Sequence, residues 1–202
     1  LSFSMLAQRR IVTLVNLLAT QGAVLFLATL LLAWRTGESH LYLSAGLTLA
    51  LKVIALPWLL HRLIRRLGVY WDTEPLLNTP STMLIGLLVV IFAFGLAQPI
   101  SALASTATRS TIGIAIAVIL LSFLTMITRR KAMSQVVGFL SMENGLFFGA
   151  MSTTYGMPMV VELGVALDVL VAMLVLGVFF FQIREQFDSL DLHNLESLKE
   201  DQ

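Results

Sequence analysis

The stretch "AMSQVVGFLSMENGLFFGAMST", residues 132–153, decides the fold. It is long enough to cross a hydrocarbon layer of about 30 Å, which takes roughly 17–25 helical residues. Glu143 is its one ionisable side chain. A charged group at the centre of a membrane helix costs about 2.5–3.5 kcal/mol on insertion scales, and such groups usually mark ion or proton pathways. The stretch therefore predicts a membrane helix that carries a functional carboxylate.

The composition of the whole chain agrees with a membrane protein. Its 202 residues are 57% hydrophobic and 12% charged, and the mean hydropathy is +0.88. The net charge of +1 gives no indication of a nucleic-acid partner. With 0 Cys, the chain itself holds no thiolate-bound iron–sulfur cluster and no cysteine-ligated zinc.

The predicted fold is an all-α integral membrane protein, because backbone inside a bilayer must satisfy its own hydrogen bonds. The connection 61–80 is charged and aromatic, and we expect it at the membrane interface. Residues 1–8 are typical of the end of an earlier helix, which would make seven spans in a longer chain. The six predicted spans are residues 11–34, 41–60, 81–100, 109–128, 132–153 and 157–182.

Basic residues predict the orientation, because Lys and Arg are enriched in cytoplasmic loops. Threading six spans leaves only Arg35 and Arg109 on one side of the membrane. Nine basic residues fall on the other side, which is therefore predicted to be cytoplasmic, together with the C-terminus. These nine are Arg9, Arg10, Arg62, Arg65, Arg66, Arg129, Arg130, Lys131 and Arg184.

Two parts of the chain resemble each other and predict an internal duplication. Stretches that begin with paired arginines at positions 9 and 129 each contain a polar residue close to a glycine inside a span, so Gln21 corresponds to Glu143. In the spans after these, "LALKVIAL" aligns with "VALDVLVAM", and Lys52 corresponds to Asp168. The prediction is two parallel three-helix repeats with a spacer helix. The predicted divisions are 1–66 (first repeat, first helix truncated), 67–106 (interfacial loop and spacer), 107–184 (second repeat) and 185–202 (cytoplasmic tail).

Three ionisable residues are predicted to lie deep in the membrane. From the nearest arginines, the helical rise places Lys52 about 15 Å, Glu143 about 20 Å and Asp168 about 24 Å from the cytoplasmic side, as upper limits. Glu162 lies closer to the opposite side. Burial brings the pKa values of carboxyl and lysine groups toward neutrality, and a nearby opposite charge reverses this shift, so such groups can exchange protons as their partners move.

We therefore interpret Glu143, Asp168, Lys52 and Glu162 as a candidate proton relay. Polar neighbours could hold bridging water; those selected are Gln21, Asn144, Gln135 and Ser141. The alternative is structural, since Lys52 could pair with Glu143 or Asp168 simply to fix helix packing. Ser and Gly also commonly line contacts between membrane helices. No metal-ligand spacing is present among the histidines.

Three motifs in order carry a resemblance to a known family. "RRKAMSQVVGFLSMENG", "VELGVALDVLVAML" and "DSLDLHNLESLKE" are similar to the E component of hydrogenase-4, found in formate hydrogenlyase-type complexes. The C-terminal third also resembles the K subunit of respiratory complex I and the C subunit of Mrp-type antiporters. In those proteins two successive helices each carry a carboxylate, at positions that match Glu143 and Asp168.

The resemblance implies a non-catalytic subunit of a group 4 hydrogenase-type complex in a bacterial or archaeal cytoplasmic membrane. Its partners would be antiporter-like subunits and the subunit that anchors the hydrophilic arm. Nickel–iron and iron–sulfur centres would belong to those other chains, with no cofactor in this one. A structural linker and a stand-alone ion transporter are the alternative functions.

Overall fold

The computed structural model describes residues 1–37, 39–67, 78–100 and 106–154, and positions 164, 166, 167, 170, 173 and 177. The predicted all-helical fold is confirmed in these ranges. The helices are α1 (Ser2–Ala7), α2 (Ile11–Thr36), α3 (Ser39–Thr48), η1 (Leu49–Ala55), α4 (Leu56–Leu67), α5 (Thr79–Ile100), α6 (Thr106–Thr128) and α7 (Ala132–Thr154).

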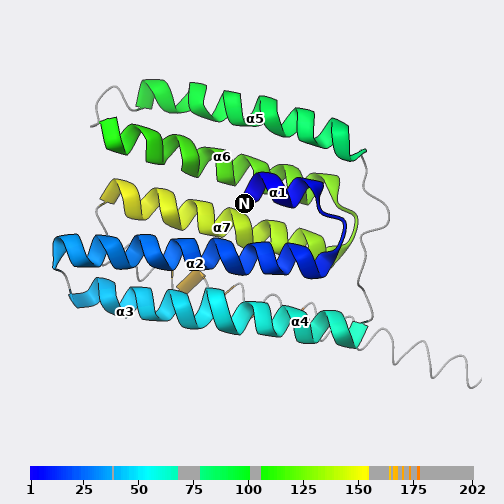
Figure 1. Ribbon diagram of the computed structural model, residues 1–202, viewed down its shortest axis with the longest axis horizontal. Coiled ribbons are helices and arrows are strands. Elements are labelled where there is room, and N and C mark those ends of the chain that lie inside the picture. Colours follow the sequence, from blue (N-terminus) through cyan, green and yellow to red (C-terminus); the bar gives the residue numbers. More distant parts are fainter. Residues whose placement is uncertain are drawn as a thin grey trace, which may run out of the picture. The chain divides into compact units, whose positions relative to one another are not determined.

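All of these helices belong to the first of two compact units, Leu1–Asp168, and within it they pack in an order that differs from the chain order. Helix α5 packs on α6, α6 on α7, and α7 on α2, while α3, η1 and α4 cover the other side of α2 (Figure 1). Helix α1 contacts α2, α5 and α6. Helix α7 therefore lies inside the bundle, between α6 and α2.

Four helical segments in the described part of the chain are long and apolar enough to cross a membrane: Ile11–Thr36, Leu41–Arg66, Thr79–Pro99 and Thr111–Thr128. They correspond to the first four predicted spans. Residues 132–153 form α7 as predicted but are not among these four, and most of 157–182 lies outside the described residues. A count of six spans thus stays a prediction.

One boundary was predicted wrongly. The second span does not end at residue 60, because α4 continues through the basic residues to Leu67. Arg65 and Arg66 lie in its last turn, where positive charge interacts favourably with the helix dipole. Of the predicted connection 61–80, residues 61–67 therefore belong to α4 and residues 79–80 belong to α5.

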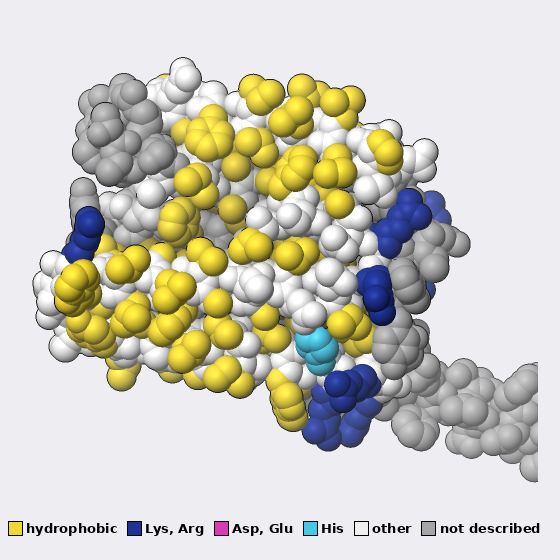
Figure 2. Space-filling model, viewed as in Figure 1, with side chains coloured by type: hydrophobic (Ala, Val, Ile, Leu, Met, Phe, Trp, Pro, Cys, Tyr) yellow, Lys and Arg dark blue, Asp and Glu magenta, His cyan; other side chains and the backbone are white. Residues whose placement is uncertain are grey.

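Large apolar side chains cover the outside of the bundle. Leu88, Ile91 and Phe92 on α5 each expose more than half of their surface, and Figure 2 shows hydrophobic side chains spread over the face in view. Most of the basic side chains in view gather at one end of this face (Figure 2). Such a surface is compatible with lipid, whereas its exposure to water would cost free energy. The chain is a multi-pass helical membrane protein.

The π-helix η1 keeps buried residues of the second span on one side. Thr48, Lys52, Leu56 and Leu60 are all buried, at intervals of four residues. In an α-helix each such interval would drift by about 40°. The wider turn of η1, closed by i→i+5 hydrogen bonds, takes up part of that drift. Lys52 thereby keeps facing the bundle interior.

Small residues allow α6 and α7 to pack closely. A Cβ at Gly145 would lie 2.7 Å from Val118 Cγ1 and 3.2 Å from the backbone nitrogen of Ile119. One turn earlier, Ser122 Oγ donates a hydrogen bond to Ser141 Oγ at 2.8 Å. This face of α7 is therefore used for helix packing.

We expect Gly145→Ala to destabilise the protein, because overpacking a close contact costs about 1–3 kcal/mol. Gly95→Ala on α5 is the matched control, since a Cβ there has no atom within 4 Å. The control should be neutral or slightly stabilising, as Ala favours helix over Gly. Thermal unfolding in detergent checks both variants, and equal midpoints for the two would contradict the packing account.

Candidate functional site

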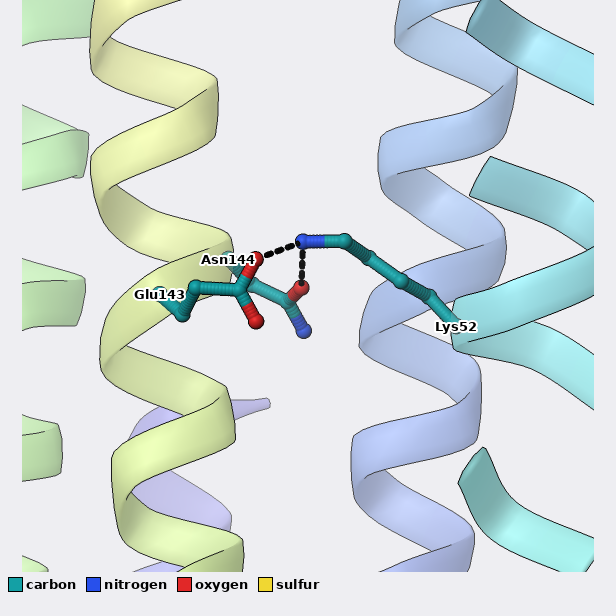
Figure 3. A network of polar contacts seen from close by, with 3 residues as sticks. All are labelled: Lys52, Glu143 and Asn144. Atoms are coloured by element: carbon teal, nitrogen blue, oxygen red, sulfur yellow. Dashed lines mark hydrogen bonds and ion pairs between the residues drawn. The ribbon is translucent and has the colours of Figure 1, made fainter. Parts of the chain in front are cut away.

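A buried ion pair joins η1 to α7. Lys52 Nζ lies 2.5 Å from Glu143 Oε1 and donates a second hydrogen bond to Asn144 Oδ1 at 3.1 Å (Figure 3). The Lys52 and Glu143 side chains are only 3% and 2% exposed. The sequence left Lys52 with two candidate acids, and the structure brings Glu143 to it.

The pair crosses α2. Helix α2 contacts both η1 and α7, and in Figure 3 the Lys52 side chain extends past α2 to reach two residues of α7. Phe147, one turn after Glu143, places its ring centroid 5.1 Å from Lys52 Nζ. An ammonium at this distance from an aromatic ring is attracted by the ring quadrupole. A carboxylate, an amide and an aromatic ring thus surround the amine.

Electrostatics make the two charges depend on each other. Burying an ion costs several kcal/mol, and only close contact with the opposite charge and further hydrogen bonds repay it. Removing one partner leaves the other charge buried and costs about 3–5 kcal/mol. Any event that neutralises Glu143 therefore changes how Lys52 is held.

A cavity of about 320 Å³ lies beside the pair. Its lining is mostly apolar, with polar groups from Ser2, Gln21 and Asn144. Gln21 Nε2 donates to Ser2 Oγ at 3.1 Å, while Gln21 Oε1 is buried and has no hydrogen-bond partner among the described residues. Asn144 both lines the cavity and accepts from Lys52, so the cavity and the ion pair share one residue.

Two of the predicted supporting residues lie away from the pair. Gln135 lies in the first turn of α7, and its side-chain amide donates a hydrogen bond to the Arg129 carbonyl at 2.9 Å. This bond ties the start of α7 to the residues that precede it. Ser141 lies on the face packed against α6 and bonds to Ser122. The position of Ser141 agrees with the alternative that serines line helix contacts, and a role of either residue in the relay stays a prediction.

Glu162 and Asp168 lie outside the described residues, so the geometry of these two predicted relay residues stays a prediction. Gly164 is described, and a Cβ there would collide with the Phe147 ring. Phe147 therefore contacts both Lys52 and the backbone at Gly164.

Arg129 is a structurally important residue that the sequence did not identify. It was counted only among the basic residues that set orientation, yet its side chain is buried. Its Nη2 donates to the carbonyl oxygens of Met5, Leu6 and Gln8, at 3.3, 3.0 and 2.5 Å. It thereby holds the C-terminal end of α1, where free carbonyls attract a cation. Its place beside Arg130, at the start of a predicted span, was the only available signal.

Within the ranges that the structure describes, no group of three or more His, Cys, Asp or Glu side chains could hold a metal ion. His61 Nδ1 lies 2.8 Å from the Pro57 carbonyl, inside its own helix. The chemistry available at the described site is therefore that of a charged pair with polar neighbours.

Comparison with known proteins gives two kinds of relative. No family model and no solved structure matches the chain. It is 37% identical over 194 residues to the uncharacterized protein Rv0085 of Mycobacterium tuberculosis, covering 96% of this chain and 88% of that protein. It is 27% identical over 186 residues to hydrogenase-4 component E of Escherichia coli K12, covering 92% of this chain and 81% of that protein. The chain belongs to the family of Rv0085, to which hydrogenase-4 component E is a distant relative.

Proposed function

We propose that this protein is a non-catalytic membrane subunit of a hydrogenase-4-like complex, and that the Lys52–Glu143 pair takes part in moving protons or Na⁺ through it. The observation that carries the proposal is a buried ion pair inside a helical bundle with an apolar exterior. The relationship to a protein named as a component of hydrogenase-4 supports the assignment to a complex. Redox chemistry would belong to partner chains.

The pair has the properties that an ion-coupling step requires. Glu143 Oε1 is the acceptor that holds Lys52 Nζ, so protonation of this carboxyl would weaken the contact. Asn144 Oδ1 and the Phe147 ring would still contact Lys52. A proton or cation arriving at Glu143 is thus coupled to the position of a neighbouring positive charge.

Water could lie beside the ion pair at the polar end of the cavity. Apolar cavities stay dry, however, and water needs two to four polar partners. We therefore place water only at the polar end, at Ser2, Gln21 and Asn144, next to the ion pair.

Asp168 and Glu162 complete the proposed relay. Asp168 is the carboxylate of the next predicted span, and the resemblance of this region to the K subunit of complex I and the C subunit of Mrp-type antiporters motivates its inclusion. Antiporter-like subunits and an arm-anchoring subunit would be the neighbours in the membrane. The predicted duplication would make Lys52 the first-repeat counterpart of Asp168.

A structural linker is the second candidate function, and the same pair favours it. A buried ion pair that joins η1 to α7 across α2 can hold three helices in register without moving any ion. Replacing Glu143 by a neutral side chain of the same shape separates the two functions, because only one of them needs a group that binds a proton.

If the pair moves ions, Glu143→Gln should assemble into the complex and lower redox-coupled ion transport by roughly tenfold or more, since the proton-carrying group is gone. Asp168→Asn should behave alike. Transport in sealed membrane vesicles, normalised to subunit content, is the measurement. Ser141→Ala is the control, because it removes a hydrogen bond from the same helix on the face packed against α6.

The structural function predicts a different pattern. Glu143→Gln would then fail to accumulate, and Lys52→Met combined with Glu143→Gln would restore assembly with normal transport. Wild-type transport by both Glu143→Gln and Asp168→Asn would end the relay proposal.

The basic residues predict that the C-terminus is cytoplasmic. A reporter that is active only in the cytoplasm, fused after Gln202, should be fully active, and one that is active only outside should be silent. The reverse result would overturn the proposed orientation and the depths assigned to the three charges.

A further inference from the structure

The Lys52 side chain must extend across α2 to reach Glu143. Lys52 belongs to η1, and its two hydrogen-bond acceptors belong to α7, on the other side of α2. A lysine has a four-carbon stem, and here its Nζ contacts an oxygen at 2.5 Å. For the amine to pass α2, the backbone of η1 must approach α2 closely.

Gly22 is the residue of α2 at this crossing. A Cβ built on Gly22 would lie 3.2 Å from Lys52 Cβ, 3.2 Å from the Lys52 carbonyl oxygen and 3.3 Å from its carbonyl carbon. Ordinary van der Waals contacts of a Cβ are 3.4–4 Å. Two of the three neighbours are backbone atoms, which cannot turn away as the end of a side chain can. A methyl group at position 22 therefore requires η1 to shift by a few tenths of an ångström.

The π-turn places Lys52 in front of this glycine. Residues 49–55 form η1, and within it Lys52 is the buried residue. Its backbone carbonyl and its Cβ both face Gly22, while its Nζ reaches α7. The residue before Gly22 is also part of the site, since Gln21 lines the neighbouring cavity.

We propose that Gly22 is a positioning residue for the Lys52–Glu143 pair: its missing side chain brings η1 close enough to α2 for Lys52 to cross and reach Glu143. Gly22 has this role whether or not the pair moves ions. The role is distinct from that of glycines that only ease packing, such as Gly145 against α6.

The test measures whether Lys52 is held in place. In purified protein, labelling by a membrane-permeant amine reagent, quantified by mass spectrometry, should leave Lys52 protected while exposed Lys131 reacts. Gly22→Ala should raise Lys52 labelling several-fold relative to Lys131, toward the level found in Glu143→Gln. Gly46→Ala on α3 is the matched control, because a Cβ there has no atom within 4 Å and the variant should label as wild type does.

A longer side chain should compensate. Lys52→Arg combined with Gly22→Ala restores reach, so the double variant should recover the part of the thermal stability of Gly22→Ala that is lost with the contact to Glu143. If Gly22→Ala alone does not accumulate, its recovery by Lys52→Arg supports the proposal, and failure of the double variant to accumulate overturns it. Wild-type protection of Lys52 in folded Gly22→Ala overturns it as well. These readouts involve no ion transport, so they are independent of the relay.

Discussion

A charged amine inside an apolar bundle must be neutralised, and that requirement organises the centre of this protein. Lys52 meets it with a carboxylate oxygen at 2.5 Å, an amide oxygen at 3.1 Å and an aromatic ring. All three come from one stretch of α7, residues 143–147. Because the donor belongs to η1, the constraint joins two helices that are separated by a third, α2. The π-turn and the close contact at Gly22 both serve this geometry.

Helix α7 can hold a charge because its two sides make different contacts. One side carries Gly138, Ser141 and Gly145 and packs closely on α6. The other presents Glu143 and Asn144 toward α2 and Lys52. Van der Waals contacts, including contacts with backbone atoms, hold the first side of α7 against α6. The second side is left for polar groups that would be costly in lipid, and this explains why a helix with a carboxylate at its centre is an interior one.

The bundle buries a second cation by other means. The Arg129 guanidinium donates through Nη2 to three backbone carbonyls at the end of α1. Backbone carbonyls cannot be protonated, so this contact is insensitive to proton movement. The Lys52–Glu143 contact instead includes a carboxylate, a group that can take up a proton. The two buried cations thus differ in the chemistry of their acceptors, and the proposed function depends on that difference.

Hydrophobic runs of about 18 residues or more were enough to predict α2, α5, α6 and the second span from the sequence, because lipid demands such runs wherever they occur. The same reasoning identified Lys52 and Glu143 as buried charges, since each interrupts an apolar run. It could not establish that Glu143 reaches Lys52. That contact depends on which helices are neighbours, and the sequences of apolar, lipid-compatible surfaces do not specify which helices pack together. The burial of Arg129 and the role of Gly22 likewise depend on which helices are neighbours in the tertiary structure. A basic residue at a helix boundary is compatible with many surroundings, and so is a glycine in a membrane helix. Arg129 has its role because α1 lies against it, and Gly22 has its role because η1 lies against it.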